Sequence, residues 1–159
     1  MNVLVTGCFG FQGVHLVLRL LEEGHKVWGL STPSEHSREN HEWLKKETDT
    51  TNLRVVWGSI NDMDLLERLP VFDAVFHLAA KVNVDESIKN PWVFVDTNIK
   101  GPLNVVMSCV MGNPTRLIMA SSCEVYGNGE ELDENSALNP QSPYAASKLG
   151  AERMAYALA

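Results

Sequence analysis

The chain has 159 residues, of which 45% are hydrophobic and 21% are charged, and its formal net charge is −7. This length allows one ordinary domain, and the composition is that of a folded globular chain rather than a disordered one. No cluster of Lys and Arg provides the positive surface that nucleic acids and anionic membranes require, so we expect neither as a partner.

No apolar run approaches the ~18 residues needed to span a bilayer, and the sequence opens on MNVLVTG without a basic segment before it. We therefore expect a cytoplasmic protein with no membrane span and no signal peptide. The three cysteines, Cys8, Cys109 and Cys123, are odd in number and show no CxxC spacing. This pattern predicts reduced thiols, with neither a disulfide framework nor a metal site.

Short β-branched runs alternate along the chain with longer segments of helical periodicity, which is the pattern of βαβ units around a parallel sheet. The predicted strands are nearly continuous apolar runs, as expected for strands covered on both faces. They are Asn2–Thr6, Lys26–Leu30, Leu53–Trp57, Ala74–Leu78 and Arg116–Ala120. The sequence thus predicts an α/β fold with a doubly wound, Rossmann-type parallel sheet of about five strands, whose ligands bind beyond the carboxyl ends of the strands.

Helices are predicted between these strands from apolar spacing and capping residues. Phe11, Val14, Leu18 and Leu21 recur at helical spacing, and Gly24 is a natural helix stop. Asp62 can cap a short helix over residues 63–69.

Two longer helices are predicted over residues 91–111 and from Pro143 to the end. Pro102 cannot donate to the carbonyl of Asn98, so either a kink leaves that carbonyl free for a water or the proline is tolerated near a bend. Residues 32–52 and 123–142 are predicted to be irregular, apart from one short helix around Glu39–Lys46.

A glycine-rich turn, TGCFGFQG, follows the first predicted strand and places Gly7, Gly10 and Gly13 three residues apart directly before a helix. Without Cβ atoms the chain can turn tightly and let a pyrophosphate approach the backbone. The free N–H groups and the helix dipole then attract phosphates. The alternative is a tight turn without a ligand, but the position between a strand and an amphipathic helix favours a dinucleotide site.

The end of the second predicted strand carries Ser31, where dinucleotide-binding folds usually place an acid that bonds the adenosine ribose. A missing carboxylate removes repulsion against a 2′-phosphate, which His36 or Arg38 could reach. Alternatively, Ser31 bonds the hydroxyls of NAD and Arg38 is a solvated surface charge. The sequence leaves the cofactor open between NAD and NADP.

The segment SPYAASK places Tyr144 and Lys148 four residues apart, on one face of the last predicted helix. A phenol, with a pKa of about 10, is a poor base at neutral pH, but a neighbouring ammonium and an oxidised nicotinamide ring both favour the phenolate. Tyr144 is therefore predicted to take a proton from a sugar hydroxyl while hydride leaves the carbon.

The segment SSCEVYG follows the fifth predicted strand. Ser122 either exchanges a hydrogen bond with the hydroxyl that Tyr144 deprotonates or satisfies its own backbone. Glu124 is either a second acid/base for elimination or a solvated loop carboxylate. Cys123 is predicted to be a small packed residue rather than a nucleophile, since nothing nearby lowers its pKa.

Taken together, TGCFGFQG, HLAAKVNV, SSCEVYG and SPYAASK resemble the extended short-chain dehydrogenase/reductase family, in particular the NAD-dependent epimerases and dehydratases that act on nucleotide sugars. The resemblance covers essentially the whole chain. It implies hydride transfer between C4 of a sugar and NAD(P), with Tyr144 as the general base, Ser122 as its helper and Glu124 as a further catalytic candidate.

The resemblance also implies how the cofactor is held, with the glycines around the pyrophosphate and Lys148 on the nicotinamide ribose. The predicted cofactor-binding residues from motif and resemblance together are Gly7, Gly10, Phe11, Gln12, Gly13, Ser31, Arg38, Ser59, Ile60, Leu78, Ala79, Ala80, Thr97, Tyr144 and Lys148. Family members usually carry Asp where Ser59 stands, Ile where Gln12 stands and often an acid where Ser31 stands. These departures bear on the affinity for NAD and on its preference over NADP.

Members of the family are much longer than this chain. The resemblance therefore implies one NAD(P)-binding Rossmann domain over residues 1–159, without the C-terminal strands and most of the nucleotide-sugar pocket. We expect an enzyme in the full-length form and near inactivity for this piece alone; a non-catalytic dinucleotide-binding module is the alternative. The resemblance further implies a homodimer in which helices at about 91–111 and 143–159 pack against the same pair in a second subunit.

Overall fold

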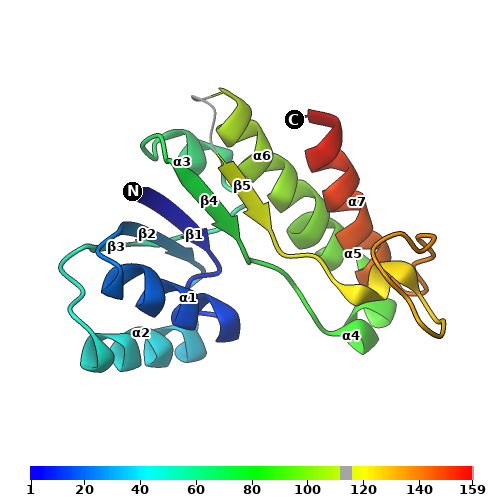
Figure 1. The fold of residues 1–159 in the computed structure, drawn as a ribbon, viewed down its shortest axis with the longest axis horizontal. Coiled ribbons are helices and arrows are strands. Elements are labelled where there is room, and N and C mark those ends of the chain that lie inside the picture. Colours follow the sequence, from blue (N-terminus) through cyan, green and yellow to red (C-terminus); the bar gives the residue numbers. More distant parts are fainter. Residues whose placement is uncertain (112–115, 159) are drawn as a thin grey trace.

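The computed structural model of the chain describes residues 1–111 and 116–158. Its centre is a five-stranded, all-parallel sheet in the order β3-β2-β1-β4-β5 (Figure 1). The strands are β1 (Asn2–Thr6), β2 (Lys26–Ser31), β3 (Leu53–Trp57), β4 (Ala74–His77) and β5 (Arg116–Met119). The predicted Rossmann-type fold is confirmed.

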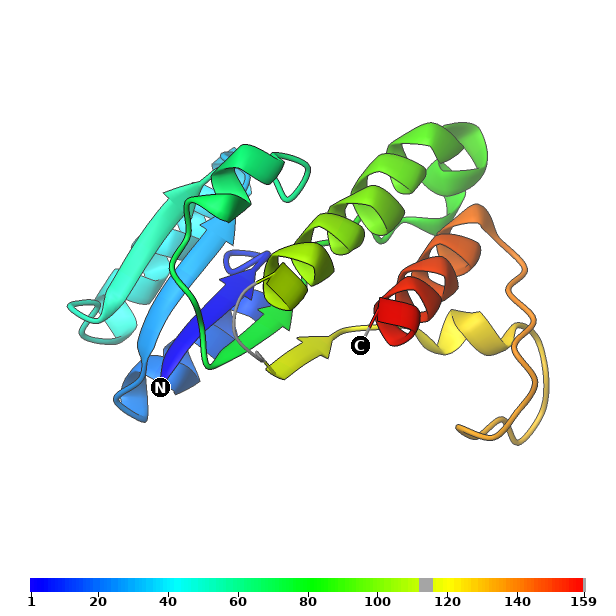
Figure 2. The same ribbon diagram turned by 90° about the horizontal axis from the view of Figure 1, so that it is seen from above.

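Helices cover both faces of this sheet (Figures 1 and 2). They are α1 (Phe11–Glu22), α2 (Glu35–Glu47), α3 (Met63–Glu67), α4 (Val84–Lys89), α5 (Pro91–Val95), the π-helix η1 (Asp96–Lys100), α6 (Gly101–Met111), the 3-10 helix η2 (Cys123–Tyr126) and α7 (Pro143–Leu158). Helices α1 and α2 lie on one face, α3 and α6 lie on the other, and α7 packs beside α6.

The two faces of the sheet form two apolar cores because successive side chains of a strand point to opposite sides. Val3, Val5 and Val27 pack against α1 and against Leu44 of α2. The intervening Leu4 and Leu30 pack with Val75 and with residues of α3 and α6. Both layers are buried at the central strands β1 and β4, which explains their continuous apolar runs, whereas the edge strands β3 and β5 are partly exposed.

Helix α2 begins earlier than the sequence pattern predicts, so the prediction of an irregular segment before Glu39 is wrong. The Ser37 N–H donates to Ser34 Oγ at 3.1 Å, and the Ser34 N–H donates to Ser37 Oγ at 2.8 Å. This is a reciprocal capping box at the start of the helix. Its second member is a serine rather than the usual Glu or Gln, which is why the start was not recognised.

The long helix predicted over residues 91–111 is continuous but contains a π-helical turn in its middle. The Gly101 N–H donates to the carbonyl of Asp96, five residues back, directly before Pro102. A wider turn at this point accommodates a residue that has no N–H of its own. The sequence left a kink and a tolerated proline as alternatives at Pro102, and the structure shows a local change of helix type there.

Other differences from prediction are small. Helix α3 ends at Glu67 rather than Leu69, β2 extends through Ser31, and β4 and β5 each end one residue earlier than expected. Helix α4 was not predicted, although Asn83 caps it by accepting the Glu86 N–H at 2.8 Å. The segment 123–142, expected to be a loop, contains η2, and the last residue of the predicted final helix, Ala159, lies outside the described residues.

Within the described residues, no helix is both long and apolar enough to cross a membrane. The same residues contain no group of three or more His, Cys, Asp or Glu side chains arranged to hold a metal ion. The cytoplasmic location stays a prediction.

Candidate functional site

A cleft with a volume of about 320 Å³ opens at the carboxyl ends of the central strands, beside the glycine-rich turn. It is lined by the turn itself and by the segments that follow β2, β3 and β4. The lining residues are Gly7, Phe9, Gly10, Leu30, Ser31, Thr32, Ser34, His36, Ser37, Gly58, Ser59, Ile60, Leu78, Ala79, Ala80, Lys81 and Thr97. The fold thus brings together the predicted residues of the turn, of the β2 end and of the segments after β3 and β4.

The glycine turn packs so closely that two of its positions, Gly7 and Gly13, have no room for a Cβ atom. Gly7 has φ +69° and donates its N–H to the Leu30 carbonyl at 2.8 Å. A Cβ at Gly13 would lie 2.1 Å from the Gly7 carbonyl oxygen. The start of α1 is thereby pressed against the turn.

The start of α1 is suited to an anionic ligand. Gly10 is the N-cap and has no side chain with which to cap the helix. The N–H groups of the first helical turn therefore remain available, at the positive end of the helix dipole. A diphosphate fits this cradle by the chemistry of its donors.

Some predicted cofactor residues do not line the cleft. Phe11 is 80% exposed, with its ring edge-on to His15, and Gln12 beside it is exposed as well. Gly13 is buried beneath the turn. Arg38 lies outside the lining, with its guanidinium 5.7 Å from the centre of the Trp57 ring. Their roles in cofactor binding stay predictions.

Sequence reasoning overlooked part of the lining, in particular the first turn of α2. This turn is held against the glycine turn by Asn40, whose amide nitrogen donates to the Phe9 carbonyl at 2.8 Å. Ser34 and Ser37 reach the cleft as a result. The serine capping box was the available signal for this arrangement, and it was not recognised as the start of a helix.

The Tyr144 and Lys148 pair points inward from α7 rather than into solvent. The two side chains are 8% and 7% exposed. Lys148 Nζ donates to the Ala120 carbonyl at 2.6 Å, just past the end of β5, and burial lowers the pKa of its ammonium. The Tyr144 ring packs edge-on against Phe94, with 6.4 Å between ring centres. Neither residue is part of the cleft lining.

Asn98, buried in the π-helix, joins the cleft to the helix that carries this pair. Its Oδ1 accepts the Lys81 N–H at 2.8 Å, and its Nδ2 donates to the Lys81 carbonyl at 2.8 Å and to Ser147 Oγ at 3.1 Å. Ser147 Oγ in turn donates to the Tyr144 carbonyl at 2.7 Å. Since Lys81 lines the cleft, Asn98 fixes α7 relative to it. The sequence drew attention only to the Asn98 carbonyl, beside Pro102, and not to its side chain, because no local pattern marks a buried amide that bonds distant segments.

Ser122, Cys123 and Glu124 lie at η2. Ser122 Oγ accepts the Glu124 N–H at 3.2 Å, the local role foreseen as one alternative, and among the described residues its hydroxyl proton has no acceptor. Ser122 and Cys123 line an open hollow of about 590 Å³ that does not include Glu124, which is exposed. The prediction that Cys123 is packed is wrong: its side chain is exposed, because this single turn buries only Val125.

His77, at the end of β4, is 2% exposed. It contacts Thr6, directly before the glycine turn, and is close enough to Lys148 of α7 to be affected by its charge. Its Nδ1 is 2.7 Å from Thr6 Oγ1, which also accepts the Ala79 N–H at 3.3 Å. Its Nε2 has no hydrogen-bond partner among the described residues. Burial, together with the charge of Lys148, lowers the pKa of His77 from 6.5 to about 3, so the imidazole is neutral at physiological pH.

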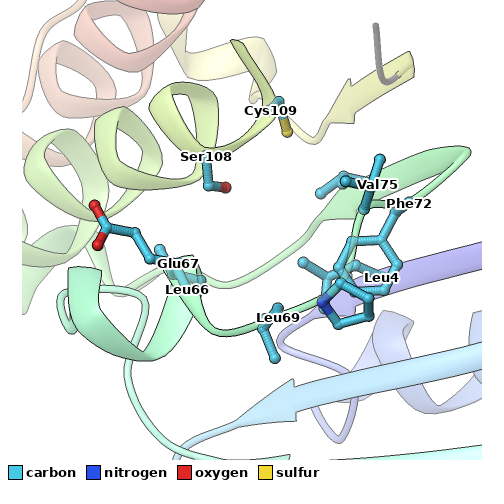
Figure 3. A pocket seen from close by; sticks show the side chains of 10 residues that line it. Leu4, Leu66, Glu67, Leu69, Phe72, Val75, Ser108 and Cys109 are labelled. Atoms are coloured by element: carbon cyan, nitrogen blue, oxygen red, sulfur yellow. The ribbon is translucent and has the colours of Figure 1, made fainter. Parts of the chain in front are cut away.

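A second cavity, of about 400 Å³, lies on the α6 face of the sheet and toward the opposite ends of the strands (Figure 3). Figure 3 shows Leu4, Leu69, Phe72 and Val75 around it, with Glu67, Ser108 and Cys109 as the polar groups. Burial raises the pKa of the Cys109 thiol, which makes it a poor nucleophile. The cavity is remote from the glycine turn and is mainly apolar, so it is unsuited to a diphosphate.

Comparison with known proteins places these features in context. The family model described as GDP-mannose 4,6 dehydratase matches residues 4–159. A UDP-glucose 4-epimerase of Pisum sativum is 32% identical over 162 residues, which cover 97% of this chain and 46% of that protein.

Two solved structures of nucleotide-sugar enzymes are also similar to this chain. The dTDP-glucose 4,6-dehydratase DesIV from Streptomyces venezuelae, with NAD and TYD bound, is 37% identical with a TM-score of 0.89, over 99% of this chain and 51% of its own. A UDP-glucose-4-epimerase from Stenotrophomonas maltophila, with bound NAD, is 31% identical with a TM-score of 0.92. The match covers 100% of this chain and 48% of the epimerase chain. The chain spans about half the length of the relatives it matches.

Proposed function

The chain belongs to the family of NAD-dependent nucleotide-sugar epimerases and dehydratases, and from that premise we propose that it binds NAD(P) in the glycine-turn cleft and supplies Tyr144 as the base that oxidises a nucleotide-linked hexose at C4. The observation that carries this proposal is the hydrogen-bonded link through Asn98. It joins Lys81, at the cleft, to Ser147, one turn from Tyr144 on α7.

In this proposal the turn residues bind the cofactor diphosphate through backbone N–H groups, and the segment Leu78–Ala80 lies along the cofactor. The nicotinamide, when bound, accepts the hydride. Lys148 keeps a positive charge beside the phenol, which favours the phenolate that removes the proton from the sugar hydroxyl. The free proton of Ser122 orients that hydroxyl.

The proposal is limited to the oxidation step that epimerisation, 4,6-dehydration and decarboxylation share. The relatives described above include both epimerases and a dehydratase. Glu124 is the residue that would separate these outcomes. Its exposed position away from the hollow beside Ser122 gives it no catalytic contact in this structure.

A second candidate, a dinucleotide-binding module without turnover, is favoured by one observation. The cleft is lined by residues between Gly7 and Thr97, so it is formed without Tyr144 or Lys148. A base that lacks a held substrate also lacks the positioning that supplies much of an enzyme's rate. Cofactor binding without turnover by the 159-residue chain is the outcome expected from this candidate.

One set of measurements separates the two candidates. Calorimetric titration with NAD and NADP tests the cleft, and the absorbance of the reduced nicotinamide after addition of UDP-, dTDP- or GDP-hexoses tests turnover. Where turnover is found, Tyr144→Phe is expected to lower it by about 10²-fold or more while cofactor affinity stays within about threefold. Full turnover in Tyr144→Phe would contradict the assignment of the base.

The proposal includes a homodimer through the α5–η1–α6 helix and α7. Large apolar side chains are exposed on these helices, among them Trp92 (76%) and Tyr156 (81%). Exposed apolar side chains on adjoining helices are typical of association surfaces. Sedimentation at micromolar concentration is expected to show a dimer, and a monomer would contradict this part.

A further inference from the structure

The adenosine end of the cleft has no carboxylate in its lining among the residues that the structure describes. Strand β2 ends there at Ser31. The preceding carbonyl, that of Leu30, accepts the N–H groups of Gly7 at 2.8 Å and Cys8 at 3.4 Å. Ser31 is thereby held beside the glycine turn, at the position where dinucleotide folds place the acid that bonds the ribose 2′-hydroxyl.

The hydroxyl of Ser31 is free to serve a ligand. Its single hydrogen bond within the described residues is to the neighbouring Thr32 carbonyl, at a long 3.4 Å. The lining continues with Thr32, Ser34 and Ser37, but the Ser37 hydroxyl donates to the Thr32 carbonyl at 2.9 Å and lies 2.8 Å from Ser34 Oγ, so the capping box already engages both serines. A carboxylate at this point would repel a phosphate, whereas the neutral Ser31 hydroxyl can donate a hydrogen bond to it.

His36 adds a donor to this end of the cleft. The Asn40 amide nitrogen donates to the Phe9 carbonyl, and it also lies 3.2 Å from His36 Nε2. An amide nitrogen only donates, so His36 Nε2 accepts and the neutral ring carries its proton on Nδ1. His36 lines the cleft from the first turn of α2, which is the positive end of the helix dipole.

Arg38 supplies a full positive charge outside the cleft lining, in a separate hollow that it shares with Glu35, Glu39 and Glu42. Its guanidinium lies 5.7 Å from the centre of the Trp57 ring, and Trp57 is the residue of β3 that pairs with Ser31 in the sheet register. Within the described residues no carboxylate forms an ion pair with Arg38. A long, exposed and unpaired arginine beside this strand end is suited to bind a phosphate.

We propose that this end of the cleft accepts a ribose 2′-phosphate, so that the chain binds NADP at least as tightly as NAD. Ser31 is the residue that determines this preference, and Arg38 is the cation that pairs with the phosphate. The inference rests on the proposed function, since it requires a dinucleotide in the cleft.

The test is calorimetric titration of the 159-residue chain with NADP, NAD, 2′,5′-ADP and ADP. The last two ligands lack the nicotinamide and therefore probe the adenosine end alone. We expect 2′,5′-ADP to bind at least as tightly as ADP. Ser31→Asp is expected to weaken NADP binding about tenfold or more and to leave NAD binding unchanged or tighter.

Arg38→Gln is expected to weaken NADP binding about tenfold without changing NAD binding. Arg54→Gln is the matched control, because the Arg54 guanidinium likewise lies over a tryptophan, Trp28, at 5.1 Å, but it lines a different hollow beside Met1 and Lys26. It is expected to change neither affinity. Since Arg38 is exposed, its substitution keeps the proposal testable even if Ser31→Asp does not fold.

Two outcomes would overturn the inference and leave the proposed function intact: NAD binding more tightly than NADP, or an unchanged NADP affinity in Arg38→Gln. Failure of all four ligands to bind would instead count against the proposed function itself.

Discussion

The glycine-turn cleft and the Tyr144 region of α7 are built by different kinds of contact. The cleft is made largely of backbone: a turn closed by the Gly7 N–H on the Leu30 carbonyl, and a helix start with no side-chain cap. The α7 region is held by buried side chains, namely Asn98, Ser147 and Lys148. Steric exclusion dominates the first region, and satisfied buried polar groups dominate the second.

The two regions should therefore lose stability in different ways when a residue is substituted. A turn that has no room for a Cβ fails abruptly when one is added. A hydrogen-bonded network loses a limited free energy for each bond removed, and the loss is larger where partners are left buried and unpaired. Substitutions in the two regions are therefore expected to differ in how much free energy of unfolding they remove.

The largest effect is expected for Gly13→Ala. Its Cβ would meet the Gly7 carbonyl oxygen at 2.1 Å and the Cys8 backbone at 2.9 Å, neither of which can move as a side-chain end does. We expect a loss of about 4 kcal/mol or more in the free energy of unfolding, or failure to fold. Denaturant unfolding followed by circular dichroism measures this loss.

The matched control for Gly13→Ala is Gly150→Ala on α7. A Cβ there would lie 3.5 Å from the nearest atom, Ile99 Cδ1, which is an ordinary contact. Alanine also favours a helix interior over glycine, so we expect a gain of up to about 1 kcal/mol. Equal stabilities for the two variants would break the contrast between the regions.

An intermediate effect is expected for Asn98→Ala. It removes three hydrogen bonds and leaves the Lys81 N–H and carbonyl without their partner. We expect a loss of about 3 kcal/mol in the free energy of unfolding. Asn104→Ala is the control: within the described residues the Asn104 side chain makes one hydrogen bond, to the Ile60 carbonyl at 3.1 Å, so its removal should cost about 1 kcal/mol. A loss for Asn98→Ala no larger than that of the control would contradict the role of Asn98 as a link.

The smallest effect is a pH dependence from His77, at the junction of the two regions. Its pKa falls from 6.5 in the unfolded chain to about 3 in the folded one, so below pH 6.5 only the unfolded state binds a proton. Stability is therefore fully present above pH 6.5 and is lost as the pH falls. We expect a loss of about 1.5 kcal/mol between pH 6.5 and about pH 5, measured by denaturant unfolding.

His77→Gln should reduce this slope, because it removes the histidine whose pKa is lowered most; burial also lowers the pKa of His41, so a smaller slope of the same sign is expected to remain. The interval above about pH 5 isolates His77 from carboxylates whose pKa is lowered in the fold, since stability from Asp49 and Asp133 is lost only as the pH drops below their ordinary value of 3.8. An unchanged slope in His77→Gln would show that another group carries the dependence.

Local patterns in the sequence determined much of this protein. Continuous apolar runs specified the parallel strands, because strands covered on both faces must be apolar throughout. Three glycines at a fixed spacing specified the turn, and two residues four apart specified that Tyr144 and Lys148 share a face of α7. Each of these features depends on residues within a few positions of one another.

Other features were decided only by the tertiary structure. The Asn98 network joins residues 17 and 49 positions apart, and the Thr6–His77 contact joins residues 71 apart. The position of Arg38 over Trp57 depends on how α2 docks against the end of β3. No local pattern encodes such pairs, because whether a buried polar group finds a partner depends on which distant segments the sheet brings beside it.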